Sequence, residues 1–296
     1  MSVVTPGRSG GAIGVTIPGA DRLVWFFLRV SGGLLVVLAG GHLFITHYLN
    51  VPTDTTFDFV ARRWANPLWR TFDWLLLMSA LWHGVLGLRY SVTDYLRRPG
   101  WRVLGHATIW VLGFLFTALG TITIFTFSEE AARKNTGPLA GQLWIAEAIG
   151  YSLYAFAFAT YVAAPGLLLW VLRSYRAGGP PVYAGDPGQY AWVLHRATGI
   201  GVLFFLLVHI IDIALIGLGR DVYDESVEFY GRIELIPMEI ALVGAVVYHT
   251  LNGLRIILID FWDVGYRRER QLFWAVLVGS VLLTVPSAIV IFAAEL

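Results

Sequence analysis

The sequence predicts an all-α integral membrane protein of seven transmembrane helices, in which two parallel three-helix repeats are joined by an extra helix. Three observations predict this class. Hydrophobic residues make up 57% of the chain and charged residues 14%, whereas soluble domains contain about 25% charged residues. Seven apolar stretches are each long enough to cross a hydrocarbon core of about 30 Å as a helix. Finally, one set of polar residues occurs twice in the chain.

The apolar stretches carry tryptophans at several of their ends, as expected for rings at a membrane interface. They lie near 23–49, 69–96, 101–127, 143–172, 192–218, 235–262 and 271–293. The glycine-rich start lacks the charged-then-apolar pattern of a signal peptide. We therefore divide the chain into a cytoplasmic tail (1–22), a first repeat (23–127), an outer loop with a linker helix and an inner linker (128–190), and a second repeat (191–296).

The two repeats share two blocks of residues. The first block returns 167 positions later: Arg29-Val30-Ser31-Gly32 and His42 become Arg196-Ala197-Thr198-Gly199 and His209. The second returns 166 positions later: His83, Gly87-Leu88-Arg89 and Asp94-Tyr95 become His249, Gly253-Leu254-Arg255 and Asp260-Phe261. The motifs run in the same direction, so the repeats are parallel. Because a three-helix repeat ends on the opposite side of the membrane, one further crossing is needed, and the stretch at 143–172 supplies it.

The basic residues predict the orientation. With the N-terminus inside, fourteen Lys and Arg residues lie in inner segments and seven in outer segments. Since basic residues are retained on the cytoplasmic side, this predicts a multi-pass protein of the cell's inner (plasma) membrane, with a cytoplasmic N-terminus and the C-terminus outside. The chain has no cysteine, which excludes disulfides and thiolate-held iron–sulfur or zinc sites.

Four histidines occupy matched positions inside the apolar stretches: His42, His83, His209 and His249. A single histidine in a membrane helix is more often a hydrogen-bonded interior residue than a ligand, but an intramembrane polar side chain needs a partner. Two pairs, each with one imidazole from either repeat, are the ligands that two six-coordinate haems need. His47, His106 and His195 have no counterpart in the other repeat. Of these, His47 and His106 are expected at the interface.

A second group of residues lies at the inner ends of the repeats. It contains Arg29, Ser31, Arg89, Asp94 and Tyr95, with the counterparts Arg196, Thr198, Arg255, Asp260 and Phe261. These basic and hydroxyl groups could neutralise haem propionates or hydrogen-bond a quinone carbonyl, although inner arginines also follow from the positive-inside rule. Because the hydroxyl of Tyr95 exists in one copy only, we expect a single quinone site built from two unequal halves.

The second repeat resembles the cytochrome b subunit of succinate dehydrogenase, on the segment from Val193 to Gly199, Tyr248-His249 and the segment from Gly253 to Phe261. The first resembles the hydrophobic anchor subunit of the same family, on Arg29-Val-Ser-Gly32, Trp82-His83 and Thr93-Asp94-Tyr95. In the family these are separate three-helix chains, whereas here they are expected to be fused.

This resemblance implies the roles of particular residues. It implies that His83 and His249 ligate a proximal haem b, and that His42 and His209 ligate a distal one. It implies a quinone, menaquinone or ubiquinone, contacted by Arg196 and Tyr95 with support from Asp94. The wider quinone and propionate neighbourhood is expected to include Arg29, Ser31, Trp192, His195, Thr198, Arg89 and Arg255. Trp192 departs from the family, which often has a serine there.

The resemblance also implies the partners: a flavoprotein subunit, an iron–sulfur subunit and membrane lipid, in a complex expected to form a higher oligomer such as a trimer, without nucleic acid. Its function would be succinate:quinone oxidoreduction in the respiratory chain and the tricarboxylic acid cycle. Three alternatives stay open: a quinol:fumarate reductase anchor running in reverse, a stand-alone dihaem cytochrome b, and a two-repeat transporter with discontinuous helices at mid-membrane.

Overall fold

The computed structural model of the chain consists of long helices, as the apolar stretches predict, and describes residues 19–50, 52–134, 142–176, 187–262, 265 and 267–294. Most of the predicted tail and most of the inner linker therefore lie outside the described residues. The long helices are α1 (Ala20–Leu43), α3 (Pro67–Tyr95), α4 (Pro99–Thr126), α6 (Leu143–Arg176), α7 (Pro187–Ala214), α9 (Ile236–Phe261) and α11 (Glu269–Ala294). Short helical segments are η1 (Phe44–Tyr48), η2 (Pro52–Asp54), α2 (Phe57–Trp64), α5 (Glu129–Lys134), η3 (Leu215–Leu218) and α8 (Arg220–Tyr230).

Within the described part of the chain, six helical segments are long and apolar enough to cross a membrane. They correspond to α1 with η1, α3, α4, α7 with η3, α9 and α11. The remaining predicted crossing, 143–172, falls on α6, which is a helix of 34 residues. The structure thus confirms an all-helical membrane protein, while the seventh crossing and the repeat architecture stay predictions.

Local sequence explains where several of these helices begin. Asn66 caps α3 by accepting a hydrogen bond from the Leu68 N–H at 2.9 Å, and a proline follows it at the first helical position, where no donor is lost. Pro99 and Pro237 likewise lie in the first turns of α4 and α9. Pro237 therefore lies at the start of a helix, whereas a transporter with discontinuous helices would have such a proline at mid-membrane.

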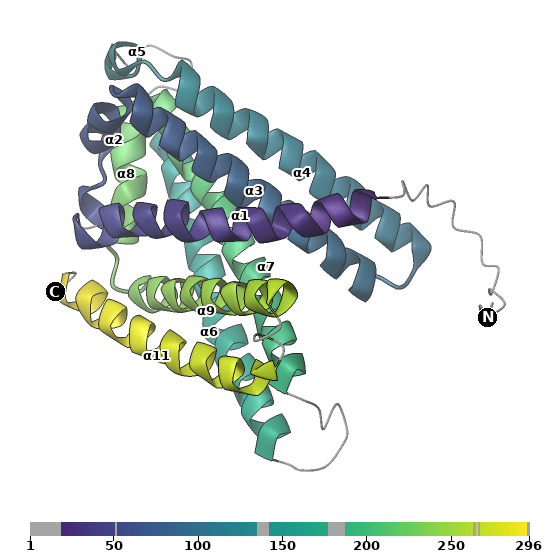
Figure 1. Cartoon of the computed structure of the whole chain (residues 1–296). Helices are drawn as coiled ribbons and strands as arrows, with labels where there is room; N and C mark the ends of the chain where they lie inside the picture. The colour runs from purple at the N-terminus through teal and green to yellow at the C-terminus, as the bar shows by residue number, and fades with distance from the viewer. Residues whose placement is uncertain are drawn as a thin grey trace.

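The two halves of the chain pack in corresponding ways. α1 lies against α3 as α7 lies against α9, and the third helices α4 and α11 lie against α3 and α9. Between the halves, α1 contacts α9 and α3 contacts α7, so these four helices meet in the middle of the molecule (Figure 1). α6 packs on the second half, against α7, α8 and α9.

Short helices close the end of the bundle that the sequence predicts to be outside. The apolar residues of α2, at 57, 60, 61 and 64, recur with helical period and are all buried. α8 lies against η2 and α2, where the Asp224 carboxylate accepts a hydrogen bond from the Phe57 N–H at 2.7 Å. Burial, together with the Asp212 and Asp224 carboxylates, raises the pKa of Tyr223 on α8 well above its ordinary value, so this phenol stays neutral.

Arg70 shows why an arginine is needed on this side of the bundle. Its guanidinium donates to the main-chain oxygens of Trp64, at the end of α2, and of Ile124 and Phe127, at the end of α4. The last carbonyls of a helix have no partner within the helix. One side chain therefore satisfies the C-terminal ends of two helices.

We expect Arg70→Ala to destabilise the protein by about 2 kcal/mol, because hydrogen bonds from a charged donor contribute that much and the carbonyls lose their partner. The midpoint of thermal unfolding of the detergent-solubilised protein measures the effect. Arg62→Ala, at an exposed position on α2, is the matched control. Equal midpoints for both variants would contradict the capping role of Arg70.

Candidate functional site

A cavity of about 890 Å³ lies between α1, α3, α7 and α9 and is lined by motif residues of both halves, among them Arg29, Gly32, Arg196 and Gly199. Most of its wall is aliphatic, with leucines such as Leu35, Leu77 and Leu203. All four matched histidines line it. An apolar cavity with a few convergent polar groups is the usual form of a cofactor site.

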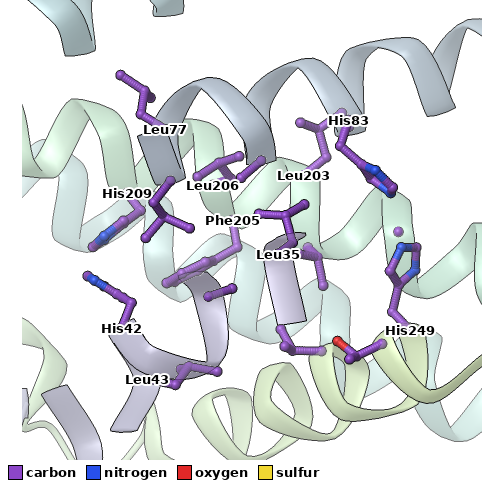
Figure 2. Close-up of a pocket in the computed structure, with 18 of the residues that line it drawn as sticks. Leu35, His42, Leu43, Leu77, His83, Leu203, Phe205, Leu206, His209 and His249 are labelled. Carbon is purple, nitrogen blue, oxygen red and sulfur yellow. The ribbon is translucent and has the colours of Figure 1, made fainter. Parts of the chain in front are cut away.

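The four histidines form two facing pairs, each with one member from either half (Figure 2). His42 of α1 faces His209 of α7, with ring centroids 6.1 Å apart and planes at 71°. His83 of α3 faces His249 of α9, with centroids 6.2 Å apart and planes at 83°. Two imidazoles bound on opposite sides of one metal ion, at about 2 Å per metal–nitrogen bond, have ring centroids about 6 Å apart. Both separations therefore fit a metal ion between the rings.

Each pair offers two protein ligands. Among the described residues, no group of three or more His, Cys, Asp or Glu side chains is arranged to hold a metal ion. The geometry thus suits a group whose metal takes its other ligands from elsewhere, as a haem iron does from its macrocycle.

In each half, the Ser or Thr of the motif contacts the Nδ1 atom of a histidine of the His83–His249 pair. Ser31 Oγ donates to the Phe27 carbonyl at 2.6 Å, which leaves its lone pairs to accept from His83 Nδ1 at 2.9 Å. His249 Nδ1 lies 3.0 Å from the His195 carbonyl oxygen and 3.4 Å from Thr198 Oγ1. A carbonyl oxygen only accepts, so His249 carries its proton on Nδ1 and keeps Nε2 for a metal.

The glycine of each motif leaves space for the same ring. A Cβ atom at Gly199 would lie 2.8 Å from His249 Cε1, and one at Gly32 would lie 3.4 Å from His83 Cε1. The motif Arg-x-[Ser/Thr]-Gly on the first helix of a half therefore holds and orients the histidine on its second helix.

Gly199→Ala is expected to displace the His249 ring and to remove more than half of the haem bound at the His83–His249 pair, since a methyl group at 2.8 Å cannot be accommodated without a shift. Haem content per chain, from the pyridine haemochrome spectrum, measures the loss. Gly32→Ala, with its longer approach, is the control and should retain most of the haem. An equal loss in both variants would show that the Gly199 contact does not decide the outcome.

His195 and His47 also line the cavity. The His195 ring stacks on His249, with centroids 3.9 Å apart and planes at 8°, so His195 packs directly against the His83–His249 pair. His47, expected at the interface, instead accepts or donates a hydrogen bond with Thr46 at 2.8 Å and lies 3.4 Å from the Glu239 carboxylate. The π-helical turn Phe44–Tyr48 that follows α1 carries it there. His106, at 3.3 Å from Thr93 Oγ1, lies outside the cavity lining.

The helix ends that the sequence predicts to be cytoplasmic carry two corresponding groups of four residues, and each group joins both halves. In the first, Arg29 pairs with Asp260 at 2.7 Å and Trp25 lies against Phe261. In the second, the equivalent Arg196 pairs with Asp94 at 2.6 Å and Trp192 lies against Tyr95. Each guanidinium stacks on its tryptophan, Arg29 at 4.9 Å and Arg196 at 3.9 Å from the ring centroid.

The two groups differ in the donors that they leave free. Arg29 is held by two contacts, because both Nε and Nη2 bond Asp260. Among the described residues, Arg196 contacts Asp94 through Nη1 alone, at 2.6 Å, which leaves its Nε and Nη2 donors over. The group whose arginine makes the single contact is also the one that contains the Tyr95 hydroxyl.

The other two arginines at matched positions, Arg89 and Arg255, also pair with carboxylates. Arg89 contacts Asp21 at 3.1 Å. Arg255 contacts Glu269 at 2.9 Å and, unlike Arg89, lines the cavity. The sequence predicted no site role for Trp25 or Glu269. The sequence did contain a signal for Trp25, since it precedes Trp192 by the repeat offset of 167.

Comparison with known proteins gives the family. The profile of the succinate dehydrogenase/fumarate reductase transmembrane subunit matches residues 13–120 and 181–286. The succinate dehydrogenase 2 membrane subunit SdhC of Mycobacterium tuberculosis is 43% identical over 116 residues, which cover 38% of this chain and 84% of that protein.

Two further relatives extend this result. The succinate dehydrogenase hydrophobic membrane anchor subunit of Halobacterium salinarum is 30% identical over 101 residues, 34% of this chain and 77% of the relative. The succinate dehydrogenase cytochrome b556 subunit of Rickettsia conorii is 35% identical over 100 residues, 31% of this chain and 73% of the relative. The chain belongs to the family of succinate dehydrogenase/fumarate reductase transmembrane subunits.

Proposed function

We propose that this chain is the membrane anchor and dihaem cytochrome b of a succinate:quinone oxidoreductase, where electrons pass from an iron–sulfur subunit to a quinone at the cytoplasmic side of the membrane. The observation that carries the proposal is the two pairs of facing imidazoles, with centroid separations of 6.1 and 6.2 Å in one cavity. Membership of the family supports a flavoprotein subunit and an iron–sulfur subunit as partners.

Two haem b groups fit the residues of the cavity. His83 and His249 would hold the proximal haem, and His42 and His209 the distal one. The Nδ1 contacts of His83 and His249 leave their Nε2 atoms to ligate, and the apolar lining suits a flat hydrophobic ring. The name of the Rickettsia relative, a cytochrome b556, agrees with this assignment. When bound, haem b supplies a one-electron carrier whose iron takes two neutral imidazoles.

We assign the quinone to the group that contains Tyr95, Trp192 and Arg196. Arg196 contacts Asp94 through Nη1, so its remaining guanidinium N–H groups can donate to a quinone carbonyl. The Tyr95 side chain is 55% exposed, so its hydroxyl can also reach a ligand and donate. Asp94 keeps the guanidinium in position at 2.6 Å and offers a carboxylate for proton transfer at the wet edge. Where related subunits often have a serine, Trp192 places its aromatic ring against the Arg196 guanidinium.

We propose further that the chain is a fusion of two three-helix subunits. The family profile matches two segments of similar length, and each relative is shorter than half of this chain. The cross-connected histidine and Arg–Asp pairs agree with two equivalent halves. In this topology α6 is the extra crossing, and the N-terminus is cytoplasmic, since the arginine-rich helix ends lie on the inner side.

The test is a dithionite-reduced minus oxidised spectrum of the purified complex, with haem quantified per chain. Two b-type haems per chain are expected. One haem would remove His42 and His209 from the site, and a haem-free complex with full quinone reductase activity would overturn the role of all four histidines. Copurification of the soluble subunits distinguishes the complex from a stand-alone cytochrome.

A further inference from the structure

The matched arginines Arg89 and Arg255 take their carboxylates from different places. Arg89 on α3 pairs with Asp21 at the start of α1. The position that corresponds to Asp21 in the second half is Gly188, at the start of α7. The second half therefore has no carboxylate where the first half has one.

Glu269, at the start of α11, supplies the missing group. Arg255 Nη2 donates to Glu269 Oε1 at 2.9 Å. A Cβ atom at Gly188 would lie only 2.7 Å from the same carboxylate oxygen. Glu269 thus occupies the space that a side chain at position 188 would fill, and the carboxylate has moved from the first helix of the half to the third.

This exchange buries the arginine. The Arg255 side chain is 5% exposed, against 31% for Arg89. Its Nη1 lies 3.5 Å from the Oδ1 of the buried Asn252, while its Nε is buried without an acceptor among the described residues. A guanidinium has five N–H donors, and a buried donor without a partner is costly. Since Arg255 lines the cavity, the missing acceptor is expected to come from a ligand there.

We propose that the Arg255 guanidinium binds a carboxylate inside the cavity, the chemistry of a haem propionate, and that Glu269 holds it there from the space left by Gly188. This inference rests on the proposed function. Arg255 follows His249 by six residues, about 9 Å along α9 toward the inner end, and both residues line the same cavity. A planar guanidinium matches a carboxylate better than other acceptors do.

Redox titration of the purified complex, followed at the haem absorbance bands, tests the role of Arg255. Arg255→Gln should lower the midpoint potential of the proximal haem by about 59 mV, which for one electron corresponds to a tenfold change in the reduction equilibrium. The reason is that a cationic donor beside a propionate favours the reduced state. The propionate bending mode in resonance Raman spectra should shift with it. Arg97→Gln, at an exposed position just beyond α3, is the control and should leave both unchanged.

A double variant tests the positioning role of Glu269. Glu269→Ala should shift the propionate mode as Arg255→Gln does, and Gly188→Asp combined with Glu269→Ala should restore it, since the carboxylate then comes from α7 as Asp21 comes from α1. Where Arg255→Gln fails to assemble, Arg255→Lys, which retains the charge without the planar fork, should still assemble and move the propionate mode.

The outcomes separate this inference from the function on which it rests. A wild-type complex without haem overturns the proposed function. If the wild-type complex binds two haems but Arg255→Gln changes neither their potentials nor the propionate modes, only the assignment of Arg255 is overturned. A higher KM for quinone with an unchanged potential would also overturn it, because Arg255 would then serve the quinone instead.

Discussion

Replacement of His249 by Leu is expected to reduce the haem content of the chain from two to one. The variant removes one of the two imidazoles that face each other at 6.2 Å, and leucine fills the space without offering a donor. His83→Leu should have the same effect, because the two residues serve one metal. Pyridine haemochrome quantification per chain measures the change, and the low-temperature spectrum of the reduced protein shows which of two bands is lost.

Variants of the other pair provide the comparison. His42→Leu and His209→Leu should remove the other band and retain the one that His249→Leu removes. His106→Leu, a histidine that lies in neither pair, should retain both. Loss of both bands in every paired variant would mean that the two sites do not bind independently, and retention of two haems in His249→Leu would exclude this residue as a ligand.

Replacement of Arg196 by Lys is expected to lower kcat/KM for the quinone at least tenfold, about 1.4 kcal/mol or more of transition-state stabilisation. Lysine keeps the charge but loses the planar fork, so it cannot contact Asp94, stack on Trp192 at 3.9 Å and donate to a carbonyl at once. Steady-state reduction of a short-chain quinone by the whole complex measures this change, with succinate oxidation by an artificial dye as the readout of the soluble subunits.

Arg29→Lys is the matched control for Arg196→Lys. Both variants break an ion pair to an aspartate of the other half, so both report the structural cost of that loss. Arg29 makes two contacts with Asp260, and its group contains Phe261 where the other contains Tyr95, so its variant should stay within roughly threefold of the wild type. Similar losses at both arginines, with haem spectra intact, would count against a single quinone site at Arg196.

The arrangement of the histidines illustrates what a sequence pattern can predict. Repetition of His42 and His83 at nearly the same offset was sufficient to expect two matched pairs, because a polar side chain in a membrane helix needs a partner wherever the fold places it. The lengths of the apolar stretches were sufficient to predict the long helices. α2, α5 and α8 were not predicted, since short amphipathic helices of this size depend on packing for their stability.

Other features depended on the tertiary structure. The sequence alone did not connect Arg29 with Asp260 or Arg196 with Asp94, because each pair lies between halves and a repeat pattern gives no contacts across them. Nor did it connect Arg255 with Glu269, since α11 approaches Gly188 only in the packed bundle.

The sequence by itself determined the membrane class, the long helices and the residue types of the site, because hydrophobic length and repetition are local properties of the chain. Only the tertiary structure decided which imidazoles face each other, which guanidinium keeps a free donor and which carboxylate pairs with each arginine. Those properties depend on distances of a few ångströms between side chains of different helices, and helix packing alone sets such distances.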